Sequence, residues 1–253
     1  MKKALAIIPA RYNSSRFPGK PLAKIGGKTM LQHVYDNVMA SGLFYDVVIA
    51  TDDGRIYTEA EKWFGKVTMT SPAHQSGTDR CAEVINTTSL NDPEIVVNIQ
   101  GDEPFISFAP LKQLLEVFGS NKEAGIATLI QKIKHPSDVI NPNIVKVVKD
   151  MNGKALYFSR APIPHIRDAE KMLQPACYKH IGLYAFRADV LREITQLQPG
   201  MLEETESLEQ LRWLENGYTI HTAETDYKML SVDTPEDLHK AEEFYLSNGI
   251  QNA

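Results

Sequence analysis

Short apolar runs alternate with longer amphipathic stretches through the first half of the chain. The apolar runs are rich in Val and Ile, and we expect them to form strands over Ala4–Ile8, Val47–Ala50, Val67–Thr70 and Ile95–Ile99. The stretches between them have helical spacing and predict helices over Met30–Ala40, Arg55–Phe64 and Thr78–Ile85. Strands that are apolar on both faces and separated by helices are typical of a parallel sheet covered on both sides. With right-handed crossovers, this order predicts an α/β fold with a Rossmann-like, doubly wound, mostly parallel sheet.

The pattern changes in the second half of the chain, where we expect antiparallel structure. Ile144–Val148 and Lys154–Ser159 flank an Asn152-Gly153 pair, which is a strong signal for a tight hairpin turn. The proline-containing segment Ala161–Gln174 has no clear period and is expected to be an extended loop or arm. Thr234 and Pro235 are suited to begin a helix. The remaining patterns predict strands over His180–Phe186 and Thr219–Thr222, and helices over Ala188–Ile194, Glu206–Asn216 and Thr234–Leu246.

We interpret residues 1–253 as a single domain with an inserted antiparallel part. The chain is 43% hydrophobic and 23% charged, as is typical of globular proteins. The apolar run near the start ends at Pro9, too early for a signal peptide, and no window approaches the ~18 apolar residues that span a bilayer. Cys81 and Cys177 lack partners at metal-ligand spacing. We therefore expect a cytoplasmic protein with two reduced thiols and no membrane partner.

The charge distribution predicts an anionic ligand at one loop. The net charge of -5 argues against nucleic acid as the main partner. However, Arg11, Arg16 and Lys20 lie close together after the first predicted strand, at the sheet edge where open α/β folds bind ligands. These cations can offset the charge of a triphosphate, and Ser14 and Ser15 can donate hydrogen bonds to its oxygens. The spacing fits neither a Walker A loop nor a GxGxxG fingerprint, and the alternative is a solvated basic loop.

Two aspartates are candidate ligands for Mg²⁺. Asp102 follows the predicted strand Ile95–Ile99, and Asp233 precedes the last predicted helix. Magnesium commonly takes one or two carboxylates together with phosphate oxygens. The alternative for Asp233 is that its charge simply favours the helix N-terminus. Together with the basic loop, the two aspartates indicate transfer of a nucleotidyl group from a metal-bound nucleoside triphosphate.

Several motifs, in order along nearly the whole chain, resemble those of one enzyme family, the 3-deoxy-manno-octulosonate (Kdo) cytidylyltransferases. The first is Pro9-Ala10-Arg11-x-x-Ser14-x-Arg16-x-Pro18-Gly19-Lys20-Pro21-Leu22. The others are Thr51-Asp52-Asp53, His74-Gln75-Ser76-Gly77-Thr78-Asp79-Arg80, Asn98-Ile99-Gln100-Gly101-Asp102-Glu103-Pro104, Tyr157-Phe158-Ser159-Arg160-Ala161-Pro162-Ile163-Pro164, His180-Ile181-Gly182-Leu183-Tyr184, Glu206-Ser207-Leu208-Glu209-Gln210-Leu211-Arg212 and Val232-Asp233-Thr234-Pro235-Glu236-Asp237.

The resemblance implies that CTP and Kdo are converted to CMP-Kdo and pyrophosphate with Mg²⁺, for lipopolysaccharide biosynthesis. It also implies a homodimer, with the antiparallel insertion supplying much of the contact. Such a transfer depends mostly on positioning and on neutralising phosphoryl charge. The implied catalytic residues are Arg11, Lys20, Asp102 and Asp233, the last two as metal ligands. The triphosphate side of CTP would be held by Ala10, Arg11, Ser14, Arg16 and Lys20.

Other residues are assigned to recognition of the cytosine base and of the sugar. Cytosine has an exocyclic amine donor, so carbonyls near Ser71, Pro72 and Ala73 are candidates to select it, with Arg80 and Gln100 contacting base or ribose. An alternative for His74–Arg80 is that it begins a helix capped by Ser76 or Thr78. Arg160 is the natural partner of the Kdo carboxylate. The Kdo hydroxyls are assigned to His180, Tyr184, Glu209 and Gln210, although His180 and Tyr184 taken singly would be core or interface residues.

Other functions remain open at this point. One alternative is a cytidylyltransferase for another acidic sugar, such as sialic acid. A hexose-phosphate nucleotidyltransferase is disfavoured because a Gly-x-Gly-Thr-Arg loop is missing. The last alternative is a catalytically silent regulator that senses nucleotides, which the formation of product from CTP would exclude.

Overall fold

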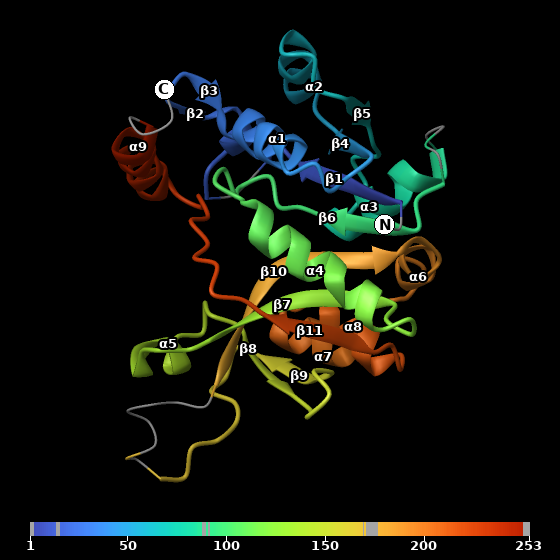
Figure 1. The fold of residues 1–253 in the computed structure, drawn as a ribbon, viewed down its shortest axis with the longest axis vertical. Helices are drawn as coiled ribbons and strands as arrows, with labels where there is room; N and C mark the ends of the chain where they lie inside the picture. Colours follow the sequence, from blue (N-terminus) through green and yellow to red (C-terminus); the bar gives the residue numbers. More distant parts are fainter. Residues whose placement is uncertain are drawn as a thin grey trace. The chain divides into compact units, whose positions relative to one another are not determined.

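A computed structural model describes residues 3–13, 16–87, 90, 92–168, 170 and 177–249 of the chain. The chain divides into two compact units, and Figure 1 shows the elements of each. Unit 1 comprises Met1–Phe108 and Lys228–Ala253, and unit 2 comprises Ala109–Tyr227. In the described part of the chain, no helix is long and apolar enough to cross a membrane.

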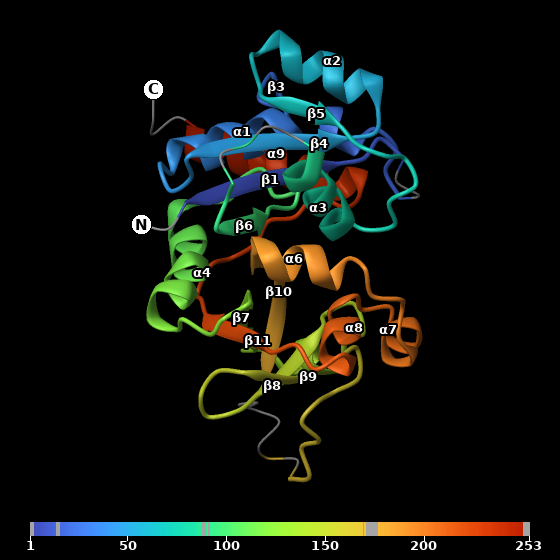
Figure 2. The ribbon, with the colours of Figure 1, turned by 90° about the vertical axis from the view of Figure 1, so that its right-hand side faces the viewer.

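Unit 1 is built on a parallel sheet. Its strands are β1 (Ala4–Ala10), β4 (Asp46–Thr51), β5 (Val67–Met69) and β6 (Ile95–Asn98), in the spatial order β6-β1-β4-β5. Helices α1 (Met30–Ala40), α2 (Gly54–Lys62) and α3 (Gly77–Thr87) connect consecutive strands. The chain moves outward from β1 to β5 and then returns to the other side of β1, so right-handed crossovers place α3 on the face opposite α1 and α2. Figure 2 shows α1 and α3 on opposite faces of these strands.

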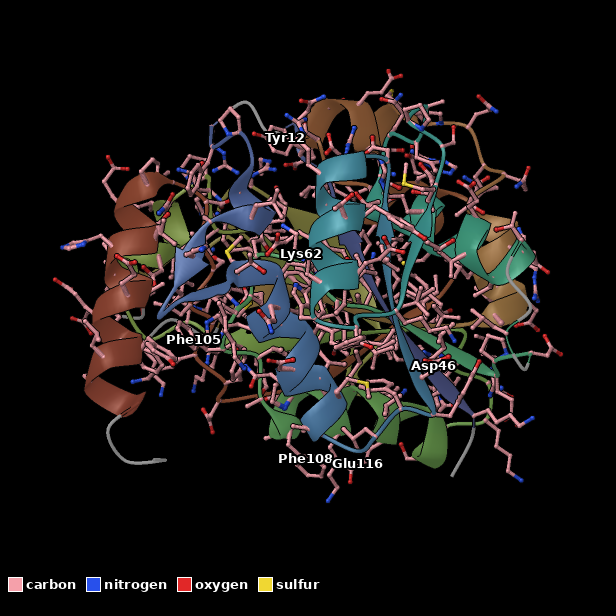
Figure 3. All side chains as sticks on the ribbon, turned by 90° about the horizontal axis from the view of Figure 1, so that it is seen from above. Tyr12, Asp46, Lys62, Phe105, Phe108 and Glu116 are labelled. Atoms are coloured by element: carbon pink, nitrogen blue, oxygen red, sulfur yellow. The ribbon has the colours of Figure 1, made fainter. Side chains whose placement is uncertain are left out.

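The last helix packs against a small hairpin of unit 1. Strands β2 (Lys24–Ile25) and β3 (Lys28–Thr29) follow the short helix η1 (Lys20–Leu22), and α9 (Pro235–Gly249) lies against β2. A Cβ at Gly26 would lie 1.9 Å from the Tyr245 ring of α9, so only glycine permits this approach. Phe105, labelled in Figure 3, packs its ring 4.8 Å from that of Phe244 in the same helix. These contacts hold the second half of α9 against the hairpin and Phe105, and Asp233 lies two residues before the helix begins.

Unit 2 combines parallel and antiparallel pairing. Strand β7 (Ile126–Lys132) pairs with β11 (Ile220–Glu224) in parallel and with β10 (Tyr178–Arg187) antiparallel. Strands β8 (Lys146–Lys149) and β9 (Ala155–Ser159) form an antiparallel hairpin whose β8 pairs with β10. The helices of this unit are α4, which begins at the last residue of unit 1 (Phe108–Ser120), α5 (Pro136–Ile140), α6 (Ala188–Ile194), α7 (Met201–Glu206) and α8 (Gln210–Glu215).

Most of the predicted elements are present, with small shifts of their ends. The Rossmann-like parallel sheet with an antiparallel part is confirmed, and so is the hairpin turn, in which Gly153 has a φ of 80° and the Asp150 carboxylate accepts from the amides of Asn152 and Lys154. Cys81 and Cys177 are both free and buried, as expected. Residues 161–168 of the predicted arm contain no helix or strand, and positions 169 and 171–174 lie outside the described residues.

The structure corrects one predicted helix and adds elements that the sequence analysis did not assign, among them η1, β2 and β3. Glu206–Asn216 is not one helix, because α7 ends at Glu206, Ser207 takes a left-handed φ of 52°, and α8 begins only at Gln210. Few L-residues adopt that conformation, and it terminates an α-helix. The sequence analysis also assigned no element to residues 105–143, where α4, β7 and α5 lie.

Candidate active site

The basic loop and the Asp102 segment meet at one edge of the unit 1 sheet. The direction of strand order reverses between β1 and β6, and open α/β sheets bind ligands beyond the carboxyl ends of the strands at such a point. β1 ends at the buried Ala10, and β6 leads into Gln100 and Asp102. A Cβ at Gly101 would lie 3.0 Å from the carbonyl oxygen of Pro9, so glycine lets the two strand ends approach. This edge is therefore the candidate nucleotide site of unit 1.

Lys20 brings the two predicted metal ligands together. Its Nζ donates to Asp102 Oδ2 at 2.7 Å and to Asp233 Oδ1 at 3.1 Å, and its side chain is only 14% exposed. The main chain supports the same arrangement, because the amide of Val232 donates to the carbonyl of Asp102 at 3.0 Å. Arg16 also donates to Asp233 Oδ1, at 3.1 Å. Residues more than a hundred positions apart thus form one charged cluster, which we call the Lys20 cluster: Arg16, Lys20, Asp102 and Asp233.

The electrostatics of the Lys20 cluster favour the charged ammonium. Desolvation opposes the charge of Lys20, but the attraction and hydrogen bonds of Asp102 and then of Asp233 outweigh it and raise its pKa above the ordinary value. Opposite charges at hydrogen-bond distance stabilise each other most where water is partly excluded. Lys20 therefore stays a cation at neutral pH, as a phosphate-binding group requires.

Glu103 is a buried carboxyl group beside this cluster that the sequence analysis did not assign. The residue is 4% exposed, and neither of its carboxyl oxygens has a hydrogen-bond partner among the described residues. Desolvation raises its pKa to about 8, with further contributions from the negative charges of Asp102 and Asp233 and an opposing one from Lys20. The only sequence signal for it was its position directly after Asp102.

The N-terminus of α9 is capped without Asp233. Thr234 Oγ1 accepts from the amide of Asp237 at 3.2 Å, and Asp237 Oδ2 accepts from the amide of Thr234 at 3.2 Å. This reciprocal pattern is a capping box, and it confirms the prediction that Thr234 is the N-cap. Asp237 Oδ2 also accepts from the Asp233 amide, while the Asp233 carboxylate accepts from Lys20 and Arg16. The observed contacts of that carboxylate thus point to the cluster and not to the cap.

Side chains of α3 hold the loop that contains Ser71, Pro72 and Ala73. Arg80 is fully buried and donates to Asp52 Oδ2 at 2.9 Å, to Thr70 Oγ1 at 2.6 Å and to the Ser71 carbonyl at 3.4 Å. The observed contacts of the buried Arg80 hold the loop, and its contact with base or ribose stays a prediction. Pro72 and Ala73 are exposed.

The start of α3 and the basic loop complete this region. Ser76 Oγ accepts from the amide of Asp79 at 3.1 Å, and Asp79 Oδ2 accepts from the amide of Ser76 at 3.1 Å, so Ser76 caps the helix. Arg11 donates to the carbonyl of Gln75 at 3.3 Å, which links the basic loop to the same segment. Gln100 is half-buried after β6, and Ser14 lies outside the described residues.

The basic loop itself is ordered by Tyr12. The amide of Gly19 donates to the Tyr12 carbonyl at 2.8 Å, and Gly19 has a φ of 72°, which glycine adopts readily. Arg55, near the start of α2, places its guanidinium 3.2 Å from the centroid of the Tyr12 ring. Tyr12 is labelled in Figure 3. These contacts hold the ring against the turn that leads into Lys20.

In unit 2, Arg160 is anchored to main-chain carbonyls. Its Nε donates to the carbonyl of Glu206 at 2.8 Å, Nη1 to that of Pro142 at 3.2 Å, and Nη2 to that of Ser207 at 3.4 Å. The buried Lys146 donates to the Arg160 carbonyl at 2.6 Å, as well as to the carbonyls of Asn141 and Ile144. These hydrogen bonds therefore fix the direction of the Arg160 guanidinium.

His180 and Tyr184 belong to one aromatic cluster on β10. Their ring centroids are 5.2 Å apart, and Tyr184 also contacts Trp213. His180 Nε2 lies 2.9 Å from Thr128 Oγ1, and desolvation lowers the pKa of His180 to about 3, so the ring is neutral at physiological pH. Desolvation, and then the charge of Glu209, raise the pKa of Tyr184 well above its ordinary value. Glu209 precedes α8, and Gln210, at its first position, is 5% exposed.

These contacts leave the Kdo assignments untested. A neutral His180 and an un-ionised Tyr184 would be able to meet sugar hydroxyls, but both rings also serve as packing residues of unit 2. Their roles as Kdo ligands, like those of Glu209 and Gln210, stay predictions.

Comparison with known proteins identifies the family. A family model described as cytidylyltransferase matches residues 5–220. The 3-deoxy-manno-octulosonate cytidylyltransferase of Cytophaga hutchinsonii is 51% identical over 239 residues, which cover 92% of this chain and 94% of the relative. The enzyme of the same name from Syntrophus aciditrophicus is 47% identical over 246 residues, which cover 97% of this chain and 98% of the relative. The chain belongs to the 3-deoxy-manno-octulosonate cytidylyltransferase family.

Solved structures agree with membership of this cytidylyltransferase family. A CMP:2-keto-3-deoxy-manno-octonic acid synthetase complexed with CTP has a TM-score of 0.90 and 42% sequence identity, covering 97% of this chain and 99% of that one. A 4-diphosphocytidyl-2C-methyl-D-erythritol synthase from Anaerococcus prevotii has a TM-score of 0.63 and 15% identity, so it shares the fold alone. The resemblance stated from the motifs is thereby confirmed.

Some supporting residues of each unit were given no role in the sequence analysis. In unit 2, Lys146 and Glu206 support Arg160, and in unit 1, Glu83 contacts the Ser71–Ala73 loop. Glu206 stands in one of the family motifs, whereas Lys146 and Glu83 are ordinary charged residues at their positions in the chain. Only their long-range partners distinguish them.

Proposed function

We propose that the protein is a 3-deoxy-manno-octulosonate cytidylyltransferase, which transfers CMP from CTP to Kdo and releases pyrophosphate. The observation that carries this proposal is the convergence of Lys20, Asp102 and Asp233 at the switch point of the unit 1 sheet, in a member of that family. We propose further that residues 1–253 act as one nucleotidyltransferase domain.

The residues of unit 1 would bind and polarise CTP. The anomeric hydroxyl of the sugar attacks the α-phosphorus, a new P–O bond forms, and the bond to pyrophosphate breaks in line. Arg11, Arg16 and Lys20 would neutralise the phosphate oxygens, with Lys20 stabilising charge as it develops on the α-phosphate. Because Lys20 is held by two carboxylates, it is pre-oriented for that contact.

The carboxylates of the Lys20 cluster fit a magnesium ion. Asp102 Oδ2 and Asp233 Oδ1 already share one cationic partner, and hard carboxylate oxygens are the donors that Mg²⁺ prefers. Within the described residues, no group of three or more His, Cys, Asp and Glu forms a metal-binding cluster, so phosphate and water oxygens would complete the coordination. When bound by Asp102 and Asp233, the ion would neutralise phosphoryl charge and lower the pKa of the sugar hydroxyl.

The residues of unit 2 would recognise the sugar acid. Arg160 presents a planar set of donors suited to a carboxylate, and His180, Tyr184, Glu209 and Gln210 would contact hydroxyls. The product CMP-Kdo would serve lipopolysaccharide biosynthesis. The cytoplasmic location and the homodimer expected from the resemblance stay predictions, and light scattering of the purified protein would test the second.

Product formation with defined substrates tests the proposal. The protein is incubated with Mg²⁺, either CTP or UTP, and either Kdo or sialic acid, and the nucleotide sugar is quantified by mass spectrometry. We expect CMP-Kdo to form much faster than any other product. Faster formation of CMP-sialic acid would assign the enzyme to another sugar, and no product from any pair would favour the nucleotide-sensing regulator.

A further inference from the structure

We infer that Glu83 is a positioning residue for base selection, because from α3 it clamps both ends of the loop of residues 71–74. The inference rests on the proposed function and on the prediction from the sequence that main-chain carbonyls near Ser71, Pro72 and Ala73 select cytosine. Glu83 itself is not proposed to touch the nucleotide.

One carboxylate oxygen makes both contacts of the clamp. Glu83 Oε2 accepts from the amide of Ser71 at 2.8 Å and lies 2.5 Å from His74 Nε2. The side chains of Glu83 and His74 are 25% and 23% exposed, so water is partly excluded from the contact. Pro72 and Ala73 lie between the two anchored residues and are exposed. The clamp therefore fixes the ends of a short segment whose middle faces solvent.

The clamp and two other hydrogen bonds surround the carbonyl of Pro72, which is available as an acceptor. The Ser71 carbonyl accepts from Arg80, and the Ala73 carbonyl accepts from Gln75 Nε2 at 3.1 Å. No described residue donates to the carbonyl of Pro72. A fixed carbonyl can accept from the exocyclic amine of cytosine, whereas uracil presents an acceptor at the same position and would be repelled. Discrimination of this kind depends on the carbonyl being held in place.

Glu83 is suited to the task because it is ionised. Desolvation opposes its charge, but the hydrogen bonds from Ser71 and His74 and the nearby charge of Arg80 hold its pKa below the ordinary value. Hydrogen bonds to a charged acceptor are roughly twice as strong as those between neutral groups. A carboxylate at this position therefore orders the loop more firmly than a neutral side chain does.

Steady-state kinetics of substituted proteins test the clamp. KM and kcat are measured for CTP and UTP at saturating Kdo, and KM for Kdo at saturating CTP. Losing a charge-assisted anchor should raise KM for CTP in Glu83→Ala about tenfold. The preference in kcat/KM for CTP over UTP should fall by about the same factor, with kcat and KM for Kdo within about twofold of the parent values. Glu83→Gln retains a neutral acceptor for Ser71, so its KM for CTP and its preference for CTP should lie between those of the parent and of Glu83→Ala.

Glu59→Ala on α2 is the matched control. Glu59 is 27% exposed and accepts from Lys62 of the same helix at 2.8 Å, so its removal breaks an ion pair outside the clamp and should leave base preference unchanged. If the parent enzyme prefers CTP and Glu83→Ala keeps the same preference, the clamp is wrong and the proposed function still stands. A parent enzyme without any preference overturns both. If circular dichroism shows that Glu83→Ala does not fold, the preference for CTP over UTP is measured in His74→Ala instead. A reduced preference in that variant supports the clamp, and an unchanged preference rejects it.

Discussion

Arg160 donates two hydrogen bonds to Glu206, one from its main chain to the side chain of Glu206 and one from its side chain to the main chain of Glu206. The amide of Arg160 donates to Glu206 Oε2 at 2.9 Å, while Arg160 Nε donates to the carbonyl of Glu206 at 2.8 Å. Glu206 Oε1 also accepts from Ser159 Oγ at 2.5 Å. This double link joins the end of β9 to the end of α7, and it fixes both the position and the direction of the guanidinium.

Replacing Arg160 by alanine should impair the use of Kdo and spare CTP. Removing one partner of a desolvated charge pair typically costs ~2–5 kcal/mol, because the other charge stays buried. We therefore expect kcat/KM for Kdo to fall by at least an order of magnitude, while the affinity for CTP measured by calorimetry stays near the parent value. Arg187→Ala is a matched control, since Arg187 also donates to main-chain carbonyls, those of Ala124 and Lys122. An equal loss of CTP affinity in Arg160→Ala would show that Arg160 is not a sugar-site residue.

Replacing either aspartate of the Lys20 cluster by asparagine should abolish most turnover. If Asp102 and Asp233 share one catalytic ion, each variant should lose roughly two or more orders of magnitude in kcat, and the double variant should lose little more than either one. Thr234 and Asp237 cap α9 by themselves, so Asp233→Asn should keep its fold in circular dichroism. Near-normal turnover in folded Asp233→Asn would leave Asp102 as the only supported ligand.

Replacing Lys20 by methionine should change the response of stability to magnesium. The substitution leaves Asp102 and Asp233 without their shared cation, although Arg16 still pairs with Asp233. The loss of the partner of Asp102, beside the buried Glu103, should destabilise the fold. We expect a lower melting temperature than in the parent, and a larger rise in it on adding Mg²⁺, because an ion that binds only the folded state stabilises it. Calorimetry with and without Mg²⁺ provides the measurement. Equal shifts in both proteins would argue against ion binding by this pair of carboxylates.

The pH dependence of stability should carry the signature of His180. Its pKa is about 3 in the folded protein and ~6.5 in an unfolded chain. Between these values the unfolded state binds one more proton, so the free energy of unfolding should rise with pH by up to ~1.4 kcal/mol per unit and then level off above pH 6.5. Urea unfolding of the parent and of His180→Gln between pH 4 and pH 7 isolates this contribution as a difference in slope. If the free energy of unfolding depends on pH equally in both proteins, the pKa of His180 is not lowered in the folded state.

The sequence by itself determined the parts of this protein whose cause is local. Runs such as Ile95–Ile99 are apolar on both faces and therefore become buried parallel strands, and Asn152-Gly153 dictates a tight turn because glycine accepts positive φ without cost. The start of α9 follows from Thr234 and Asp237, three residues apart, which satisfy each other's amides. The motifs also placed the chain in its family, since they recur in order along nearly its whole length.

Only the tertiary structure decided which charged residues meet. Lys20, Asp102 and Asp233 are brought together by strand order and by the packing of α9, and Arg80 turned out to be a buried support of the loop. Ser207 interrupts a stretch with helical spacing, and it does so beside Glu206, which is bound to Ser159 and Arg160, far away in the sequence. The periodicity of a sequence reflects only neighbours along the chain. The partners of Glu83 and Glu206 and the burial of Glu103 depend on contacts between distant segments of the fold.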